Sequence, residues 1–162
     1  RVLRSVAIAS MALGGVTVAS YWSLMFAYQY GGINQLLHAI NLDNWAIDWL
    51  GNPKVVFFSV MIMLIWKFFG YAALVLLGGL QGIPGSHIEA ARIDGANTVQ
   101  LYTRVLLPQI TGHIFTITLL LSMYLLKTFD YVYILTGGGP GWASTVFPVL
   151  IYRKMFLIVS GL

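Results

Sequence analysis

The sequence predicts an all-α polytopic membrane protein, and three observations carry that prediction. Of the 162 residues, 59% are apolar and only 9% are charged, whereas about 25% are charged in an ordinary soluble domain. Three apolar stretches are each long enough to cross a bilayer as a helix: residues 6–26, 55–77 and 111–135. A polar and charged segment over residues 78–110 separates the second stretch from the third.

The first predicted span, residues 6–26, has charges before it and aromatic residues after it. Arg1 and Arg4 precede the span. Aromatic side chains gather at its far end, as they do at a membrane–water interface: Tyr21, Trp22 and Tyr28. A loop over residues 28–54 follows, in which apolar residues at helical spacing predict a short surface helix: Ile33, Leu36, Leu37 and Ile40. Because residue 1 is not Met and the chain stops directly after an apolar run, we expect an internal piece of a longer protein.

The second and third predicted spans carry charges near their middles, namely Lys67, Lys127 and Asp130. A charge at the bilayer centre costs at least about 2.5–3.5 kcal/mol, so these side chains are expected to face protein or water. Lys127 and Asp130 stand three apart on one predicted helix and can pair locally. A structural salt bridge is therefore the favoured interpretation, with the lining of a polar path as the alternative. Lys67 is expected to snorkel or to bridge subunits.

The polar segment between these spans predicts two short helices joined by a glycine. Ser86 and Glu89 have the S-x-x-E spacing of a capping box, which predicts a first helix over residues 87–94. Gly95 follows at the position where a helix commonly ends in the left-handed conformation.

A second cap predicts the helix on the other side of that glycine. Asn97 is followed three residues later by Gln100, a pair that can cap a helix start. Pro108 disfavours helical geometry just upstream, so this helix is expected to end before it.

These residues resemble the "EAA loop" of a known family, the membrane permease subunits of ATP-driven, binding-protein-dependent importers. The matching groups are Glu89-Ala90-Ala91, Asp94-Gly95-Ala96 and Leu107-Pro108. Two further stretches are similar to the maltose-type, sugar-importing branch: Gly79-Leu80-Gln81-Gly82-Ile83-Pro84 and Leu135-Thr136-Gly137-Gly138-Gly139-Pro140-Gly141. The resemblance covers about residues 65–156.

The resemblance implies a part of a fold of about six spans in the cell inner (cytoplasmic) membrane, of which three spans are visible. Residues 78–110 would be a cytoplasmic coupling loop, and residues 28–54 and 136–156 would lie on the periplasmic side. The implied partners are a second permease subunit, identical or different, two cytoplasmic ATPase subunits, an extracytoplasmic solute-binding protein, membrane lipid and a sugar-like solute. ATP and Mg²⁺ would bind the ATPase subunits, and this chain would hold no cofactor. Arginines on the loop side outnumber opposite-side cations by four to three, which weakly favours the same orientation.

The resemblance also assigns residues to the contact with the ATPase. In this family the glutamate of the loop lies in a helix that inserts into a cleft of the ATPase subunit. The implied coupling residues are Glu89, Ala90, Ala91, Arg92, Asp94 and Gly95. Without the resemblance, Glu89 is explained by the capping box alone, Gly95 by the turn, and the neighbouring charges by solvation.

A candidate solute path runs along facing stripes of the second and third spans. Its predicted members are Lys67, Tyr71, Tyr124, Lys127, Thr128, Asp130 and Tyr131. Aromatic rings with hydroxyls suit sugars, although such stripes are more often packing. In the resembling family the sugar site lies on these two spans, with aromatic residues at the positions of Tyr71 and Tyr124. Other site positions of the family fall on Phe68, Leu125 and Thr128, which are mostly less polar than in the maltose case.

Several function classes are excluded or disfavoured. The three histidines have no metal-ligand spacing, no catalytic triad stands out, and the glycine-rich stretch at 137–141 lacks the Gly-Lys-Ser/Thr of a phosphate loop. The basic residues are not clustered as nucleic-acid binding requires. We therefore predict no catalytic residues, no metal site and no enzyme activity. The alternatives are an ion- or proton-coupled carrier or channel using Lys67, Lys127 and Asp130, an importer of another solute such as a polyol or glycerol phosphate, and a membrane anchor.

Overall fold

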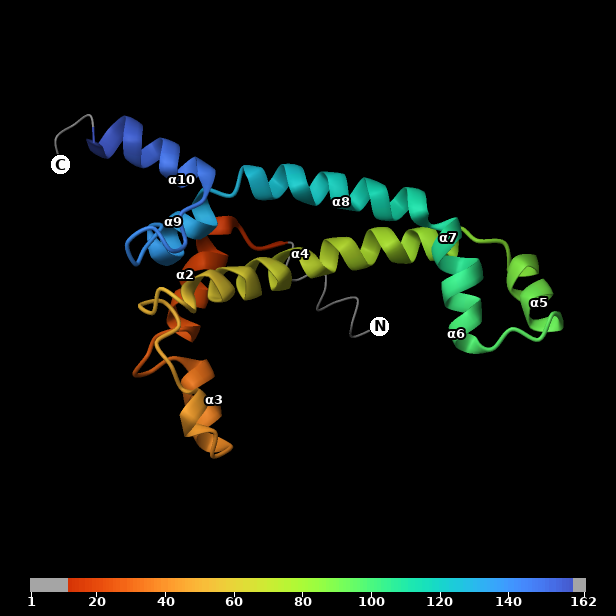
Figure 1. The fold of residues 1–162 in the computed structure, drawn as a ribbon, viewed down its shortest axis with the longest axis horizontal. Coiled ribbons are helices and arrows are strands. Elements are labelled where there is room, and N and C mark those ends of the chain that lie inside the picture. The colour runs from red at the N-terminus through yellow and green to blue at the C-terminus, as the bar shows by residue number, and fades with distance from the viewer. Residues whose placement is uncertain (1–11, 159–162) are drawn as a thin grey trace.

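The computed structural model describes residues 12–158, in which the regular structure is helical throughout (Figure 1). The α-helices are α2 (Gly15–Met25), α3 (Gly32–Ala39), α4 (Val56–Gln81), α5 (Gly85–Ile93), α6 (Thr98–Gln100), α7 (Leu107–Gln109), α8 (Thr111–Leu126), α9 (Asp130–Thr136) and α10 (Phe147–Tyr152). A 3₁₀ turn, η1 (Asp43–Trp45), and two π turns, η2 (Leu101–Leu106) and η3 (Arg153–Ile158), complete the set.

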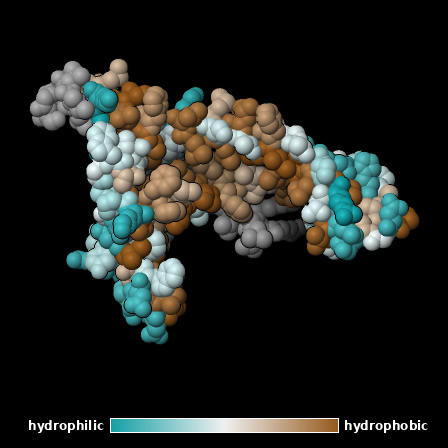
Figure 2. Space-filling model, viewed as in Figure 1, coloured by the Kyte–Doolittle hydropathy of each residue, from teal (hydrophilic) through white to brown (hydrophobic). Residues whose placement is uncertain are grey.

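Helix α4 runs along the long axis of the molecule (Figure 1). Its 26 residues are long and apolar enough on average for a membrane span, and within residues 12–158 it is the one helix that meets this criterion alone. It extends four residues beyond the predicted end at Leu77. Helix α8 runs beside it, and polar loops lie at both ends of the pair, with apolar side chains on the visible face between them (Figures 1 and 2).

The first span was predicted as one helix over residues 6–26, but α2 begins only at Gly15. Gly14 before it is extended, with φ −65° and ψ 157°, which interrupts the helix in the middle of the predicted span. Residues 6–11 lie outside the described part of the chain. The pair of glycines explains the break, because neither residue favours a helical backbone.

The third span was also predicted as continuous, over residues 111–135, and the structure divides it. Helix α8 ends at Leu126, the chain turns at Lys127–Phe129, and α9 starts at Asp130. Local bonds end α8, because the amides of Lys127 and Thr128 donate to the carbonyls of Tyr124 and Leu125, three residues back. At its other end α8 meets the helical segment Thr98–Gln109 at a bend of 66°.

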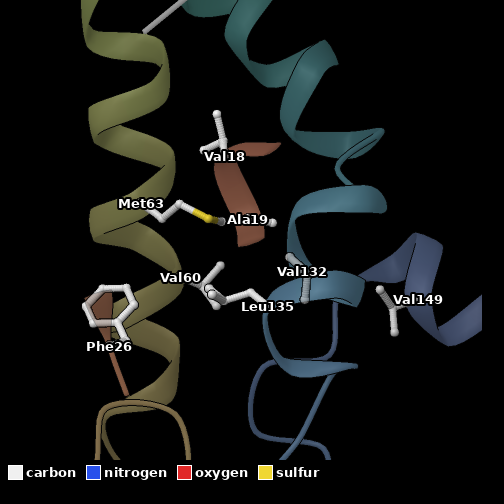
Figure 3. Close-up of a cluster of buried hydrophobic side chains, with 8 residues drawn as sticks. All are labelled: Val18, Ala19, Phe26, Val60, Met63, Val132, Leu135 and Val149. Atoms are coloured by element: carbon white, nitrogen blue, oxygen red, sulfur yellow. The ribbon is translucent and has the colours of Figure 1, made fainter. Parts of the chain in front are cut away.

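A small core lies where α2, α4, α9 and α10 meet (Figure 3). It is formed by side chains that are almost fully buried: Val18, Ala19, Phe26, Val60, Met63, Val132, Leu135 and Val149. The short helices α2 and α9 pack mainly against each other. Helix α4 adds Val60 and Met63 to this core.

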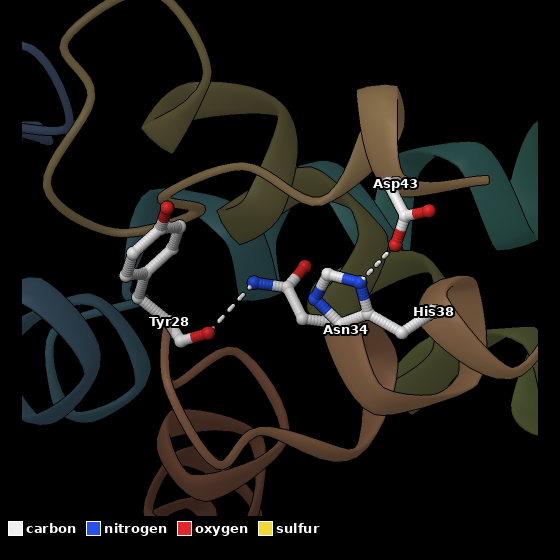
Figure 4. A network of polar contacts seen from close by, with 4 residues as sticks. All are labelled: Tyr28, Asn34, His38 and Asp43. Carbon is white, nitrogen blue, oxygen red and sulfur yellow. Dashed lines mark hydrogen bonds and ion pairs between the residues drawn. The ribbon is translucent and has the colours of Figure 1, made fainter. Parts of the chain in front are cut away.

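The loop between α2 and α4 contains the predicted surface helix, which forms as α3. Asn34 on α3 is buried and organises the loop: its Nδ2 donates to the carbonyls of Tyr28 and Ile47, and its Oδ1 accepts from the indole of Trp49. On the exposed side of α3, His38 pairs with Asp43 (Figure 4). This loop lies at the end of α4 that is opposite α5 (Figure 1).

The glycine-rich stretch forms a turn, as predicted, between α9 and α10. Gly137, Gly138 and Gly141 have positive φ, which glycine adopts without strain. The buried hydroxyl of Ser144 donates to the carbonyl of Gly139 and contacts the Thr136 hydroxyl. Helix α10 starts after Val146, without a side-chain cap.

Candidate functional site

The polar loop between α4 and α8 is built around a tightly closed helix end. At the end of α5, the amide of Gly95 donates to the carbonyl of Arg92, and the amide of Ala96 donates to the carbonyl of Ala91. This pair of bonds is the Schellman motif, and it requires the φ of +78° found at Gly95. The predicted helix–glycine break is confirmed.

The capping box predicted at Ser86 and Glu89 is wrong. Helix α5 starts at Gly85, earlier than expected, with Pro84 before it and no side-chain cap. Because the helix begins one residue before Ser86, that hydroxyl is no longer at the capping position. The carboxylate of Glu89 is exposed and forms no hydrogen bond or ion pair with the part of the chain that the structure describes.

The second predicted cap is confirmed. The amide of Gln100 donates to Asn97 Oδ1 at 2.9 Å, and the amide of Asn97 donates to Gln100 Oε1 at 3.0 Å. The helix does not end before Pro108, however, but continues through the π turn η2 to Gln109. A local π turn can satisfy backbone groups that a proline would leave unpaired, which explains how Pro108 fits inside a helical segment.

The loop has a core of its own and is tied together at its base. Ala91 packs against Leu101 and Leu106, and all three are buried. At the base of the loop, His87 Nδ1 lies 2.8 Å from Gln109 Oε1, joining the start of α5 to the end of α7. These contacts connect the two helical parts of the loop to each other.

The outer surface of this loop carries both charge and apolar area. Glu89, Arg92 and Asp94 are exposed, as is Ala90, whereas Ala91 faces inward. Two large apolar side chains are also unusually exposed: Ile93 at 86% and Val99 at 70%. Neither residue was predicted as part of the site. The sequence feature that could have identified them is an apolar residue on each side of Gly95 in an otherwise polar segment.

A second candidate feature is a pocket of about 310 Å³ halfway along α4. It is lined by Lys67, Phe68, Tyr71, Tyr124, Lys127, Thr128 and Tyr131. Six of the predicted path residues are thus brought together, although they come from three helices rather than two. Of the other positions suggested by family resemblance, Phe68 and Thr128 line this pocket, and Leu125 lines an apolar groove beside it.

The aromatic wall of the pocket centres on Phe68. Its ring centroid lies 5.9 Å from that of Tyr124 and 6.2 Å from that of Tyr131. Tyr131 also packs on α2, because a Cβ placed on Gly15 would lie 3.3 Å from its ring. Contacts between the rings restrict their orientation, so that their apolar faces can pack against a ligand. The phenol hydroxyls can form hydrogen bonds to it.

The predicted salt bridge between Lys127 and Asp130 does not form. The helix ends between the two residues, which removes the spacing on one helix face that the pairing needed. Lys127 is exposed at the pocket, whereas Asp130 is not among the lining residues. The Cβ of Asp130 lies toward Gly15 of α2 instead.

Pocket-lining side chains bond to the backbone beside both helix breaks. Lys67 Nζ donates to the carbonyl of Leu13 at 2.6 Å, directly before the break at Gly14. At the other break, the Thr128 hydroxyl donates to the carbonyl of Tyr124 at 3.0 Å. Irregular backbone at membrane depth is tolerated where protein buries it or where it lines a watery cavity. This arrangement can hold a polar solute, and the described residues contain no cluster of three metal-ligating side chains.

A comparison with known families decides the class of protein. The model of the family described as "binding-protein-dependent transport system inner membrane component" matches residues 1–161. The chain belongs to this family. Its similarity to curated members supports the same conclusion. A probable ABC transporter permease protein of Pyrococcus horikoshii is 34% identical over 153 residues, covering 94% of this chain and 52% of the relative.

Other members of the family carry names that refer to sugars. The trehalose/maltose transport system permease protein of Thermococcus litoralis is 36% identical over 152 residues, covering 94% of this chain and 51% of the relative. The fold is similar to a chain of a bacterial ABC transporter involved in the import of the acidic polysaccharide alginate, with a TM-score of 0.79 and 26% identity. That match covers 98% of this chain and 55% of the other. The chain thus spans about half the length of the family members that it matches.

Proposed function

We propose that this chain is the membrane-spanning part of an ATP-driven importer that carries a sugar or a related small solute by alternating access. The observation that carries the proposal is the loop from α5 to α7, whose Schellman turn, capping box and buried core form one unit with an exposed, charged rim. Such a unit suits docking to cytoplasmic ATPase subunits. Membership of the permease family supports the assignment.

The position of the loop suggests how movement reaches the solute. One end of the loop continues from α4, and the other enters α8 at the 66° bend. Both helices contribute side chains to the pocket lining, among them Tyr71 on α4 and Tyr124 on α8. A displacement of the loop by the ATPase subunits would therefore tilt the two helices that form the pocket walls.

The pocket supplies the chemistry expected for a sugar. Apolar C–H faces of a sugar can stack on Phe68 and Tyr124, and the phenol groups of Tyr71 and Tyr131 can answer its hydroxyls. Relatives named for trehalose/maltose and for xylose/arabinose support this solute class.

The proposed assembly contains partners beyond this chain. A second permease subunit would complete the path, and two ATPase subunits would bind ATP and Mg²⁺ at the cytoplasmic loop. A solute-binding protein would dock on the outer face near the glycine-rich turn, and a solved structure of an alginate transporter includes such a periplasmic protein. The chain would reside in the inner membrane and cross it more than once.

Co-purification tests this proposal. The intact protein, extracted in mild detergent, is expected to retain a soluble ATPase, and reconstituted vesicles are expected to hydrolyse ATP faster when solute is present. An ion- or proton-coupled carrier would transport without an ATPase, driven by an ion gradient alone. Gradient-driven uptake in vesicles without ATP would contradict the proposal.

A further inference from the structure

The charges that line the pocket are all positive. Lys67 and Lys127 contribute ammonium groups, and the five other lining residues are aromatic or carry a hydroxyl: Phe68, Tyr71, Tyr124, Thr128 and Tyr131. Among residues 12–158, no carboxylate contributes to this lining. The pocket therefore differs in charge from a site suited to a neutral sugar, where hydroxyls and amides suffice.

The two lysines have different surroundings. Lys67 is buried, with 7% of its surface exposed, and its Nζ donates to the carbonyl of Leu13. Lys127 is exposed at the end of α8, and its ammonium group forms no hydrogen bond or ion pair with residues 12–158. The ammonium of Lys127 is therefore available to a ligand, and Lys67 lines the same pocket.

Asp130 is the acidic residue nearest in sequence to Lys127, and it is not among the lining residues. It begins α9, lies outside the pocket lining and directs its Cβ toward Gly15 on α2. Even if its full charge acted on the pocket, the two lysines would leave an excess of one positive charge. A cation held at membrane depth is costly unless water or an anion satisfies it.

We propose that the solute bound in this pocket is an anionic sugar derivative, bearing a carboxylate or a phosphate that pairs with Lys127. The sugar ring stacks on the wall formed by Phe68 and Tyr124, and the ammonium of Lys127 forms a charge-assisted bond to the anionic group. This inference rests on the proposed function, since it specifies the solute of the same site.

The sign of the electrostatic potential in the pocket can be measured in the assembled transporter with charged thiol reagents. This measurement does not require that the solute be known. The chain has no cysteine, so Tyr71→Cys places one thiol in this chain, at the pocket wall. The thiol is modified with an anionic and with a cationic methanethiosulfonate reagent, and each rate is followed by the increase in mass of this chain. Each rate is divided by the rate of the same reagent with a free thiol in solution. The normalised ratio is expected to favour the anionic reagent.

Variants at Lys127 make the test specific. Lys127→Gln is expected to lower the anionic preference at least about threefold, because a unit charge nearby is removed, and Lys127→Arg is expected to retain it. Lys54→Gln, an exposed charge on the outer loop, is the matched control and is expected to change nothing. A ratio that shows no anionic preference, or that Lys127→Gln leaves unchanged, would overturn the inference.

Protection of the same thiol identifies the anionic group. Glucuronate or glucose 6-phosphate is expected to slow labelling where glucose does not, and the difference between the two acids distinguishes carboxylate from phosphate. Protection by glucose alone would overturn the inference. Either failure would leave ATPase co-purification and solute-stimulated hydrolysis intact, whereas failure of the proposed function would remove those as well.

Discussion

Two glycines of the loop between α4 and α8 show how one backbone angle distinguishes a position that requires glycine from one that tolerates another residue. Gly95 has a φ of +78°, and a Cβ added there would meet nothing within 4 Å. Gly85 also has open space around its Cα, but it lies in the first turn of α5. Only the backbone conformation distinguishes the two sites, because space is available at both.

Alanine substitution at these glycines is therefore expected to have opposite effects. Gly95→Ala should destabilise the loop by about 1–2 kcal/mol, the cost of a left-handed residue with a side chain. Gly85→Ala should be neutral or stabilising by up to about 1 kcal/mol, because it reduces the freedom of the unfolded chain. Hydrogen exchange of the loop amides measures both, and equal effects would contradict the account.

The tyrosines of the pocket are expected to contribute to solute binding rather than to folding. Tyr124 is 54% exposed, so Tyr124→Ala should leave assembly and basal ATP hydrolysis intact while weakening solute affinity by about 1–3 kcal/mol, roughly 5- to 150-fold. Tyr71→Ala should act in the same direction. Leu126→Ala, also exposed but outside this pocket, is the control. Loss of assembly in the tyrosine variants would identify them as packing residues.

At the scale of elements, the sequence predicted helix ends that are determined by the residue at the end itself. It did not predict helix ends that are determined by packing against other parts of the chain. Asn97 and Gln100 form their capping box, and Gly95 ends α5. Ser86 fits the same pattern but does not cap, because α5 starts one residue earlier than the pattern requires. The break at Lys127–Phe129 has neither glycine nor proline, and the charged residues Lys127 and Asp130 around it predicted pairing on one helix rather than a break.

The two candidate caps give a direct test at this scale. Asn97→Ala removes the bond from the Gln100 amide and is expected to lower the stability of the segment from α6 to α7 by about 0.5–2 kcal/mol. Ser86→Ala should stay within about 0.5 kcal/mol of the parent, as a surface substitution does. Exchange rates of amides 98–101 report the first change and amides 85–90 the second. A large loss in Ser86→Ala would show that the hydroxyl caps α5 after all.

At the scale of the whole molecule, composition predicted the helical membrane class, and spacing together with the family resemblance predicted six residues of the pocket lining, although Asp130, also predicted, lies outside it. Neither predicted that two of the expected spans are interrupted at the level of that pocket, near Gly14 and Thr128. The glycine pair is a local cause of the first break, but the contact in which Lys67 of α4 binds the carbonyl of Leu13 is not local. A local pattern contains no information about a donor 54 residues away.

Orientation is a prediction for the whole molecule. If the α5–α7 loop is cytoplasmic, a cysteine at Thr98 should react with an impermeant reagent only in inside-out vesicles, and one at Ala143 only from the outside. The chain has no cysteine of its own, so each label is specific within it. The reverse pattern would contradict the orientation and the docking role of the loop.

The coupling role of Glu89 is the central claim, and the uptake of solute per ATP hydrolysed tests it most directly. Because Glu89 is exposed and does not cap α5, Glu89→Gln and Glu89→Ala should both leave loop exchange rates unchanged. Both should reduce coupling in vesicles that contain the intact transporter, whereas Asp43→Asn on the outer loop should not. Coupling equal to that of the parent protein in both Glu89 variants would contradict the account.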